Sequence, residues 1–421
     1  MRINDYEANR LRLLKAIRRT EPVARTQLVQ MTGLAAGTIS ETTAELVQNL
    51  ILIEEKAMTA GSGRPRIHLR LNPDAAYVVG AMLLPFAGLD VCIVNLRGDR
   101  LYSQKVELTR ADSLPDLAEH LARLIEQVIV ESPFAKDTIH SVGLGLPALV
   151  NSAKGTLHWM QTYPIQPFAM AEVMSRYLSL PVKIDSGANI IARAEHWFGD
   201  SLEMDDFCLM VLGWGTSLAQ YADGMLWSGS SGLNPEFAHT KVVFENGRLC
   251  TCGATGCLVA YSGIHGIVSQ VCEARGIDVP DFAHLNAMFD EIAQDARKAE
   301  PVASKAFARA GQFLGTAMSN HVNFWNPKRI IFLCDNESLA GLLALPVRAA
   351  LQQNSLPTFS GQATIEFRVI SEEQYSKGAA ALVLEQLYRV PKTKEAARIS
   401  DLAAQELSRT ARVALAKLIQ L

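Results

Sequence analysis

The stretch Cys250-Thr-Cys-Gly-Ala-Thr-Gly-Cys257 determines how the rest of the chain is interpreted. It places three of the seven cysteines within eight residues, and two glycines supply the backbone freedom that a tight knuckle needs. Together with one upstream histidine, the three thiolates form a Cys₃His set, which is typical of a closed structural zinc site. The alternative is a group of buried or redox-active cysteines, which the glycine-punctuated spacing disfavours. We predict one structural zinc ion per chain, bound by His239, Cys250, Cys252 and Cys257.

Length and composition favour a large intracellular protein. The 421 residues suggest two or three domains, and 49% hydrophobic residues are enough to form large cores. No apolar run reaches the ~18 residues of a membrane span, and no signal-peptide-like apolar segment follows the N-terminus. Seven cysteines in so long a chain do not form a disulfide framework. We therefore expect a protein of the reducing cytoplasm that spans no membrane.

The net charge of −3 is unevenly distributed. Residues 1–72 carry a net charge of +4, and the remaining residues carry −7. A basic N-terminal region on an acidic body indicates a nucleic-acid-binding module, although a difference of this size also arises by chance.

The first 72 residues have the pattern of a winged helix-turn-helix. Apolar residues recur at helical spacing in three segments, Thr32-Gly33-Leu34 forms a turn before the third, and two alternating segments follow as strands of a wing. The alternative is a three-helix domain of another kind, but the glycine turn and the small residues that open the third helix favour DNA binding. The predicted helices and strands cover residues 6–19, 26–31, 35–50, 51–55 and 67–71.

In such a domain the start of the third helix enters the major groove. Thr38 can contact a phosphate or a thymine methyl group, and Glu41 can accept a hydrogen bond from cytosine. The loop Gly63-Arg-Pro-Arg66 is extended and suits a narrow A·T-rich minor groove; alternatively, its arginines contact only phosphates. The predicted DNA-contacting residues are Arg25, Thr26, Ala36, Gly37, Thr38, Glu41, Thr42, Arg64 and Arg66.

Residues 73–390 have the element order of a two-lobed α/β domain. Three strands, a helix and a further strand come first, which is the opening of the ribonuclease H-like fold of actin and sugar kinases. The second lobe begins near residue 208, and residues 391–421 form a C-terminal helical extension that packs on the body or makes an oligomer contact. The predicted elements cover residues 77–84, 88–96, 99–108, 114–131, 141–146, 180–184, 188–198, 208–213, 302–324, 329–334 and 378–388.

Pro235-Glu-Phe-Ala-His239, followed by Cys250-x-Cys-Gly-x-x-Gly-Cys-Leu258, resembles the signature of the ROK family. This family groups bacterial sugar kinases with sugar-responsive transcriptional repressors, and the resemblance extends over about residues 10–390. It implies a winged helix-turn-helix followed by a two-lobed ROK domain. It also implies a zinc knuckle beside a sugar pocket, in which Glu236 and His239 bind sugar hydroxyl groups.

The chain departs from the ROK kinases where phosphoryl transfer needs its chemistry. The kinases have Asp-x-Gly-Gly-Thr where this chain has Met82-Leu-Leu-Pro-Phe-Ala-Gly88, and Glu-Asn-Asp-Ala-Asn where it has Asp185-Ser-Gly-Ala-Asn189. Gly187 therefore stands at the position of the base that deprotonates the sugar. A Gly-Gly pair near the adenosine site is replaced by Cys334-Asp335. We predict that the chain is not an enzyme.

The sugar pocket of the family is also only partly kept. A second glutamate is replaced by Val259, and an asparagine of the base motif by Ser186. Trp159, Trp214 and Trp227 fall in loops near the expected cleft, where they stack on a ligand or belong to the core. The effector is then a modified or less polar sugar, or there is none.

Together these patterns predict a zinc-containing ROK transcriptional regulator, a repressor of carbohydrate-metabolism genes. Its partners would be operator DNA and a sugar or sugar-derivative effector. A two-fold operator requires paired heads, so we expect a homodimer or a homotetramer. The alternatives are an ATP-dependent sugar kinase and a ligand-independent regulator controlled by a protein partner.

Overall fold

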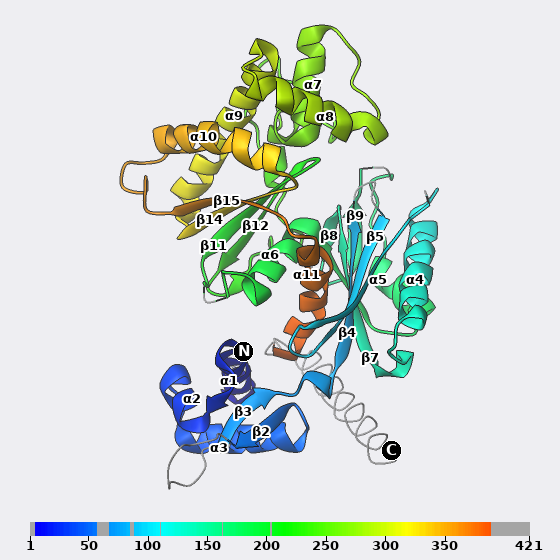
Figure 1. The fold of residues 1–421 in the computed structure, drawn as a ribbon, viewed down its shortest axis with the longest axis vertical. Coiled ribbons are helices and arrows are strands. Elements are labelled where there is room, and N and C mark those ends of the chain that lie inside the picture. The colour runs from blue at the N-terminus through cyan, green and yellow to red at the C-terminus, as the bar shows by residue number, and fades with distance from the viewer. Residues whose placement is uncertain are drawn as a thin grey trace.

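The computed structural model describes residues 5–56, 67–84, 88–109, 111–161, 163–202 and 204–388. A small N-terminal head lies at one end of a two-lobed body (Figure 1). The predicted DNA contacts Arg64 and Arg66 and the predicted extension 391–421 lie outside the described residues. Within the ranges given above, no helix is both long and apolar enough to span a lipid bilayer.

The head packs three helices against a three-stranded sheet with the order β1-β3-β2. Leu13, Leu28 and Ile39, one from each helix, meet in its core. The third helix ends at Gln48, two residues before the predicted end, because Leu50 has a φ of 59°. The sequence analysis did not predict β1, which is only two residues long. The elements are α1 (Asp5–Thr20), β1 (Val23–Ala24), α2 (Arg25–Thr32), α3 (Ala36–Gln48), β2 (Leu52–Lys56) and β3 (Ile67–Leu71).

The first lobe follows a short 3₁₀ turn at Pro73–Ala75 and is built on a five-stranded sheet with the order β10-β7-β4-β5-β6. β4, β5 and β6 are antiparallel neighbours, whereas β7 and β10 join in parallel. Two helices and a small hairpin complete the lobe. Its elements are β4 (Tyr77–Leu84), β5 (Gly88–Asn95), β6 (Arg100–Val106), α4 (Leu114–Glu131), β7 (Ile139–Leu146), β8 (Leu149–Asn151), β9 (Thr156–Trp159), α5 (Met170–Leu178) and β10 (Val182–Ser186).

The second lobe repeats this topology, because its sheet has the corresponding order β13-β12-β11-β14-β15. Again the first three strands are antiparallel and the last two are parallel. A long insertion between β13 and β14 carries the cysteine knuckle and three helices. The elements are β11 (Phe207–Leu212), β12 (Thr216–Ala222), β13 (Met225–Leu226), α7 (Gly263–Arg275), α8 (Phe282–Arg297), α9 (Pro301–Trp325), β14 (Arg329–Cys334), α10 (Glu337–Asn354) and β15 (Thr364–Val369).

The two lobes exchange their last helices. α6 (Gly187–Phe198) follows the first sheet but packs on the second, and α11 (Glu372–Leu384) follows the second sheet but crosses the first (Figure 1). Glycines make this crossing close. A Cβ on Gly80 of β4 or Gly143 of β7 would lie within 3.0 Å of carbonyl oxygens of α11, closer than real Cβ atoms come. α11 begins six residues before the predicted start at 378, since Ser371 and Gln374 form a capping box.

The head is attached to the body at the far ends of these two helices. The guanidinium of Arg18 lies 3.7 Å from the ring centre of Trp197 in α6. Ala380 and Leu384 of α11 belong to the same apolar cluster as the core of the head. Glu21 of the head forms an ion pair with Arg97 of the body, with 3.5 Å between Oε1 and Nε. Head and body therefore share buried surface rather than being joined by a free linker.

The glycine-lined crossing generates a stability prediction. Gly143→Ala should lower the free energy of unfolding by at least ~1–3 kcal/mol, because α11 must move away from β7 to admit the methyl group. Gly341→Ala in α10 is the matched control, because a Cβ there meets no atom within 4 Å. This substitution replaces a glycine inside a helix and should not lower the stability. Urea titrations followed by circular dichroism compare the two. Equal stability of Gly143→Ala and the wild type would mean that the close crossing is dispensable.

Candidate ligand cleft and metal centre

The cysteine knuckle is shaped by short backbone hydrogen bonds and by two left-handed glycines. The Gly253 N–H donates to the Cys250 carbonyl at 2.9 Å, and the Cys250 N–H donates to the Ala254 carbonyl at 2.8 Å. Gly256 has a φ of 77°, and a Cβ there would overlap the Val243 carbonyl. The loop thus folds back on itself and brings its three thiols close together, with Cys250 and Cys257 buried and Cys252 exposed.

The four predicted metal ligands come together as the sequence predicted. One donor atom from each of them lies within 4.8 Å of the other three. Zinc–sulfur bonds of ~2.3 Å and zinc–nitrogen bonds of ~2.0–2.1 Å at tetrahedral angles place two sulfurs ~3.8 Å apart and sulfur ~3.5 Å from nitrogen. The Cys252 and Cys257 sulfurs are 3.8 Å apart, and Cys250 Sγ lies 3.5 Å from His239 Nδ1. The donor set therefore fits a tetrahedral metal ion.

The surroundings of the knuckle are compatible with thiolate ligands. Burial, and then the nearby ammonium of Lys241, lowers the pKa of His239, which keeps the imidazole in the neutral form that binds metals. The Lys241 Nζ lies 3.1 Å from Cys257 Sγ, where it stabilises negative charge on the sulfur. Burial raises the pKa of Cys250 to about 11, so a bound cation is what would hold this thiol deprotonated.

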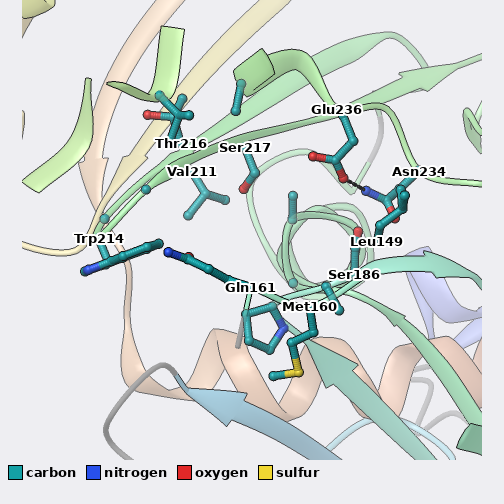
Figure 2. A pocket seen from close by; sticks show the side chains of 18 of the residues that line it. Leu149, Met160, Gln161, Ser186, Val211, Trp214, Thr216, Ser217, Asn234 and Glu236 are labelled. Atoms are coloured by element: carbon teal, nitrogen blue, oxygen red, sulfur yellow. Dashed lines mark hydrogen bonds between the residues drawn. The ribbon is translucent and has the colours of Figure 1, made fainter. Parts of the chain in front are cut away.

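A cleft of about 380 Å³ opens between the two lobes beside the knuckle. Figure 2 shows its lining, with Leu149, Met160 and Ser186 from the first lobe and Trp214, Thr216 and Glu236 from the second. Of the three tryptophans that were expected near the cleft, Trp159 and Trp214 line it. Trp227 does not, and instead makes an edge-on contact with Trp325 at 5.4 Å.

Glu236 is positioned in the cleft by both lobes. Asn234 Nδ2 donates to Glu236 Oε1 at 2.8 Å (Figure 2). The Val150 N–H of β8 donates to Asn234 Oδ1 at 2.9 Å. His239 Nε2 lies 3.8 Å from the other oxygen of Glu236. Burial among protein atoms raises the pKa of Glu236. The sequence analysis missed Asn234, which lies one residue before the motif that it used.

Ser186 lines this cleft, and its hydroxyl is left unsatisfied by the protein. The residue is 5% exposed, and its Oγ is buried and has no hydrogen-bond partner among the described residues. A buried hydroxyl without a partner is costly, so this part of the cleft wall is not optimised for stability alone.

This chain has no carboxylate at the two places where the ROK kinase motifs carry one, the segment that begins at Met82 and position 187. The Met82 side chain lies so close to Gly145 and Gly187 that a Cβ on either glycine would come within 3.0 Å of it. Asp185 is 1% exposed and is bound by Asn189 at 2.8 Å and by Arg193 at 3.0 Å. Asp185 therefore serves the packing of α6, and an apolar thioether occupies the floor of the cleft.

The third helix of the head presents small and polar residues to solvent. Of the predicted DNA contacts, Thr38 is half-buried, and those that are exposed are Thr26, Ala36, Gly37 and Glu41. The outward stripe of α3 also contains three residues that the sequence analysis left out, namely Ser40, Ala44 and Gln48. Their spacing of three or four residues along the helix, starting from Gly37, was the sequence signal that could have identified them.

Two predicted DNA contacts are placed differently. Thr42 is 1% exposed because it shares the inward stripe of α3 with Ile39, so the prediction that it lies on the outward face was wrong. Arg25 is half-buried and donates to Thr43 Oγ1 at 2.8 Å and to Glu54 at 2.7 Å. Its guanidinium therefore connects α2 with α3 and β2 within the head.

Comparisons with known proteins identify relatives of the whole chain and of the body alone. A model of the ROK family matches residues 87–386. A xylose repressor of Caldicellulosiruptor bescii is 25% identical, over 91% of this chain and 97% of the repressor. A glucokinase of Halalkalibacterium halodurans is 24% identical, over 98% of the kinase but only 74% of this chain. The crystal structure of a ROK family transcriptional regulator, a homologue of Escherichia coli Mlc, superposes with a TM-score of 0.78, covers 96% of this chain and 99% of its own, and is 23% identical.

The metal centre generates a direct prediction. Protein purified without added metal should contain about one zinc per chain by elemental analysis. Cys252→Ser should lose most of this zinc and unfold at a lower temperature, because three remaining ligands leave the tetrahedron incomplete. Thr255→Ala, in the same exposed loop, is the control and should keep the zinc. A folded wild type without metal would contradict the assignment.

The cleft floor generates a second prediction. The wild type should not transfer phosphate from ATP to glucose or N-acetylmannosamine above the rate without protein, because no carboxylate stands at position 187 to take the hydroxyl proton. Gly187→Asp should stay inactive, since Met82 occupies the space beside it and the phosphate-cradling glycines are also missing. Radiolabelled ATP gives the most sensitive assay, and steady turnover by wild type would refute the prediction.

Proposed function

Because this chain belongs to the ROK family, we propose that it is a DNA-binding transcriptional regulator, a repressor of carbohydrate-metabolism genes. Its ROK domain would bind an effector without phosphorylating it. The main support for this proposal is the N-terminal head. The alignment with the xylose repressor includes 91% of the chain, whereas about a quarter of the chain has no counterpart in the glucokinase.

The architecture of the head supports binding to DNA. Two helices joined by a glycine turn, with α3 exposed along one side and β2 and β3 following it, match a winged helix-turn-helix. We assign residues 1–72 to DNA binding, 73–390 to effector binding and oligomerisation, and 391–421 to a helical extension. The outward stripe of α3 would enter the major groove, and Arg64 and Arg66 would contact the adjacent minor groove.

Two helices connect the cleft with the head, as an effector-controlled repressor requires. α6 starts in the cleft at Gly187 and ends near Trp197, which Arg18 of the head covers. α11 borders the cleft with Tyr375, near its start, and ends at Leu384, inside the cluster shared with the head. A ligand that changes the angle between the lobes therefore moves both attachment points of the head. This arrangement supports control of DNA binding from the cleft.

The DNA-binding assignment is tested with charge substitutions. Genomic fragments that wild type retains are first selected, and the affinity of each variant for them is then measured by fluorescence anisotropy. Ala44→Glu places a negative charge on the outward face of α3 and should weaken binding at least tenfold. Val130→Glu adds the same charge at an exposed position of α4 in the body and should leave binding unchanged.

Two further results of this titration are informative. Arg64→Ala should weaken binding to the selected fragments more than to scrambled DNA if Arg64 enters a minor groove, and both equally if it contacts only phosphates. Wild type that retains no genomic fragment above background, or equal losses for Ala44→Glu and Val130→Glu, would contradict the proposed function.

A further inference from the structure

The cleft between the lobes has an acidic lining. Two carboxylates, Glu236 and Asp335, line it, and its described lining contains no lysine or arginine. His239, which belongs to the metal centre, is the one histidine in the described lining. Figure 2 shows Glu236 and Trp214 apart from each other at the two ends of the drawn pocket, and Asp335 belongs to the Trp214 end.

Asp335 covers a backbone turn of the kind that binds anions. It follows β14 directly, and its carboxylate lies so close to Gly213 that a Cβ there would come within 3.0 Å of it. The Trp214 backbone N–H donates a hydrogen bond to the same carboxylate. Backbone N–H groups in glycine-containing turns are common phosphate sites. In this chain an internal carboxylate already occupies the turn, so a phosphate group in this part of the cleft would meet a like charge.

The charge on Asp335 is not balanced by the protein. Asp335 forms no ion pair with any residue that the structure describes, and its hydrogen-bond partner besides Trp214 is the Tyr375 hydroxyl, which donates at 3.3 Å. The carboxylate is open to the cleft, yet surrounding protein raises its pKa to about 6. It is thus largely ionised at neutral pH, and an opposite charge in the cleft would be attracted to it.

The side chains around Asp335 suit an ammonium group. Asp335 and the Tyr375 hydroxyl provide acceptors for its N–H groups, and the aromatic rings of Trp214 and Tyr375 line the same end of the cleft. At the other end, the side chains of Glu236 and Asn234 can bind neutral hydroxyl groups. The two ends therefore differ in the chemistry that they accept.

We propose that the cleft takes a phosphate-free amine, a sugar or related polyol whose protonated amino group binds between Asp335, Tyr375 and Trp214. This inference deepens the proposed function and rests on it, because it specifies the chemical class of the effector. Sugar phosphates and nucleotides are excluded by the same carboxylate that binds the amine.

The test is isothermal titration calorimetry on the full-length chain with matched sugars. Glucosamine, mannosamine and galactosamine are compared with their N-acetyl derivatives, which lack the charge, and with their 6-phosphates. At least one free amine should bind, and at least tenfold more tightly than its N-acetyl derivative and its 6-phosphate. The proposal is overturned if no free amine binds at 10 mM, or if acetylated or phosphorylated sugars bind more tightly.

Variants show whether Asp335 is responsible. Asp335→Asn keeps the shape but removes the charge, and should weaken the amine at least tenfold. Glu337→Gln removes an exposed charge two residues away in α10 and should have no effect. An unchanged amine affinity in Asp335→Asn would overturn the proposal. Binding to selected genomic DNA is measured separately. An amine that binds a chain unable to bind DNA would therefore refute the proposed function alone, and DNA binding without amine binding would refute this inference alone.

Discussion

The close contact between α11 and the first sheet is the constraint on which the arrangement of this protein depends. Gly80 and Gly143 lack the side chains that would hold the helix away, so α11 crosses β4 and β7 at backbone distance. A second contact of this kind, between Gly378 and the Ile190 carbonyl, brings α11 against α6. Because each helix belongs in sequence to one lobe and packs on the other, the contacts between the two lobes and between the body and the head all involve this one pair of helices.

The cleft differs from the phosphoryl-transfer site that the kinase motifs of the family lead one to expect. No carboxylate stands at position 187, and the Met82 thioether, which lies close by, makes the floor apolar. Asp335, at the end of β14, places a negative charge over the glycine turn. Glu236 is oriented by Asn234 and, through it, by β8 of the other lobe. The polar groups for recognition are thus held by contacts that do not involve position 187.

The sequence predicted most of the fold because its signals were local. The knuckle spacing and the upstream histidine identified four residues that the fold brings together and that could hold a metal ion, and the apolar stripe of 114–131 gave the bounds of α4. What it did not predict depends on contacts distant in the chain. The exchange of α6 and α11 leaves no local pattern, and the relation of Asp335 to Gly213 joins residues of different strands. Thr42 was misplaced for another reason: a polar residue was assigned to the outside, although the helical period places it beside Ile39 in the core.

The attachment of the head to the end of α6 has a mechanical consequence. The twelve residues of this helix span ~18 Å at 1.5 Å per residue, from the floor of the cleft to the Trp197 ring against which Arg18 is stacked. A rotation of ~10° about the cleft end of so rigid an element displaces its other end by ~3 Å. In the proposed dimer, two recognition helices that read half-sites one turn of DNA apart would have to keep a separation of ~34 Å, so a displacement of this size in each chain would change that separation. The length of α6 would thus convert a small rotation at the cleft into a shift that a DNA-bound pair of heads could not accommodate.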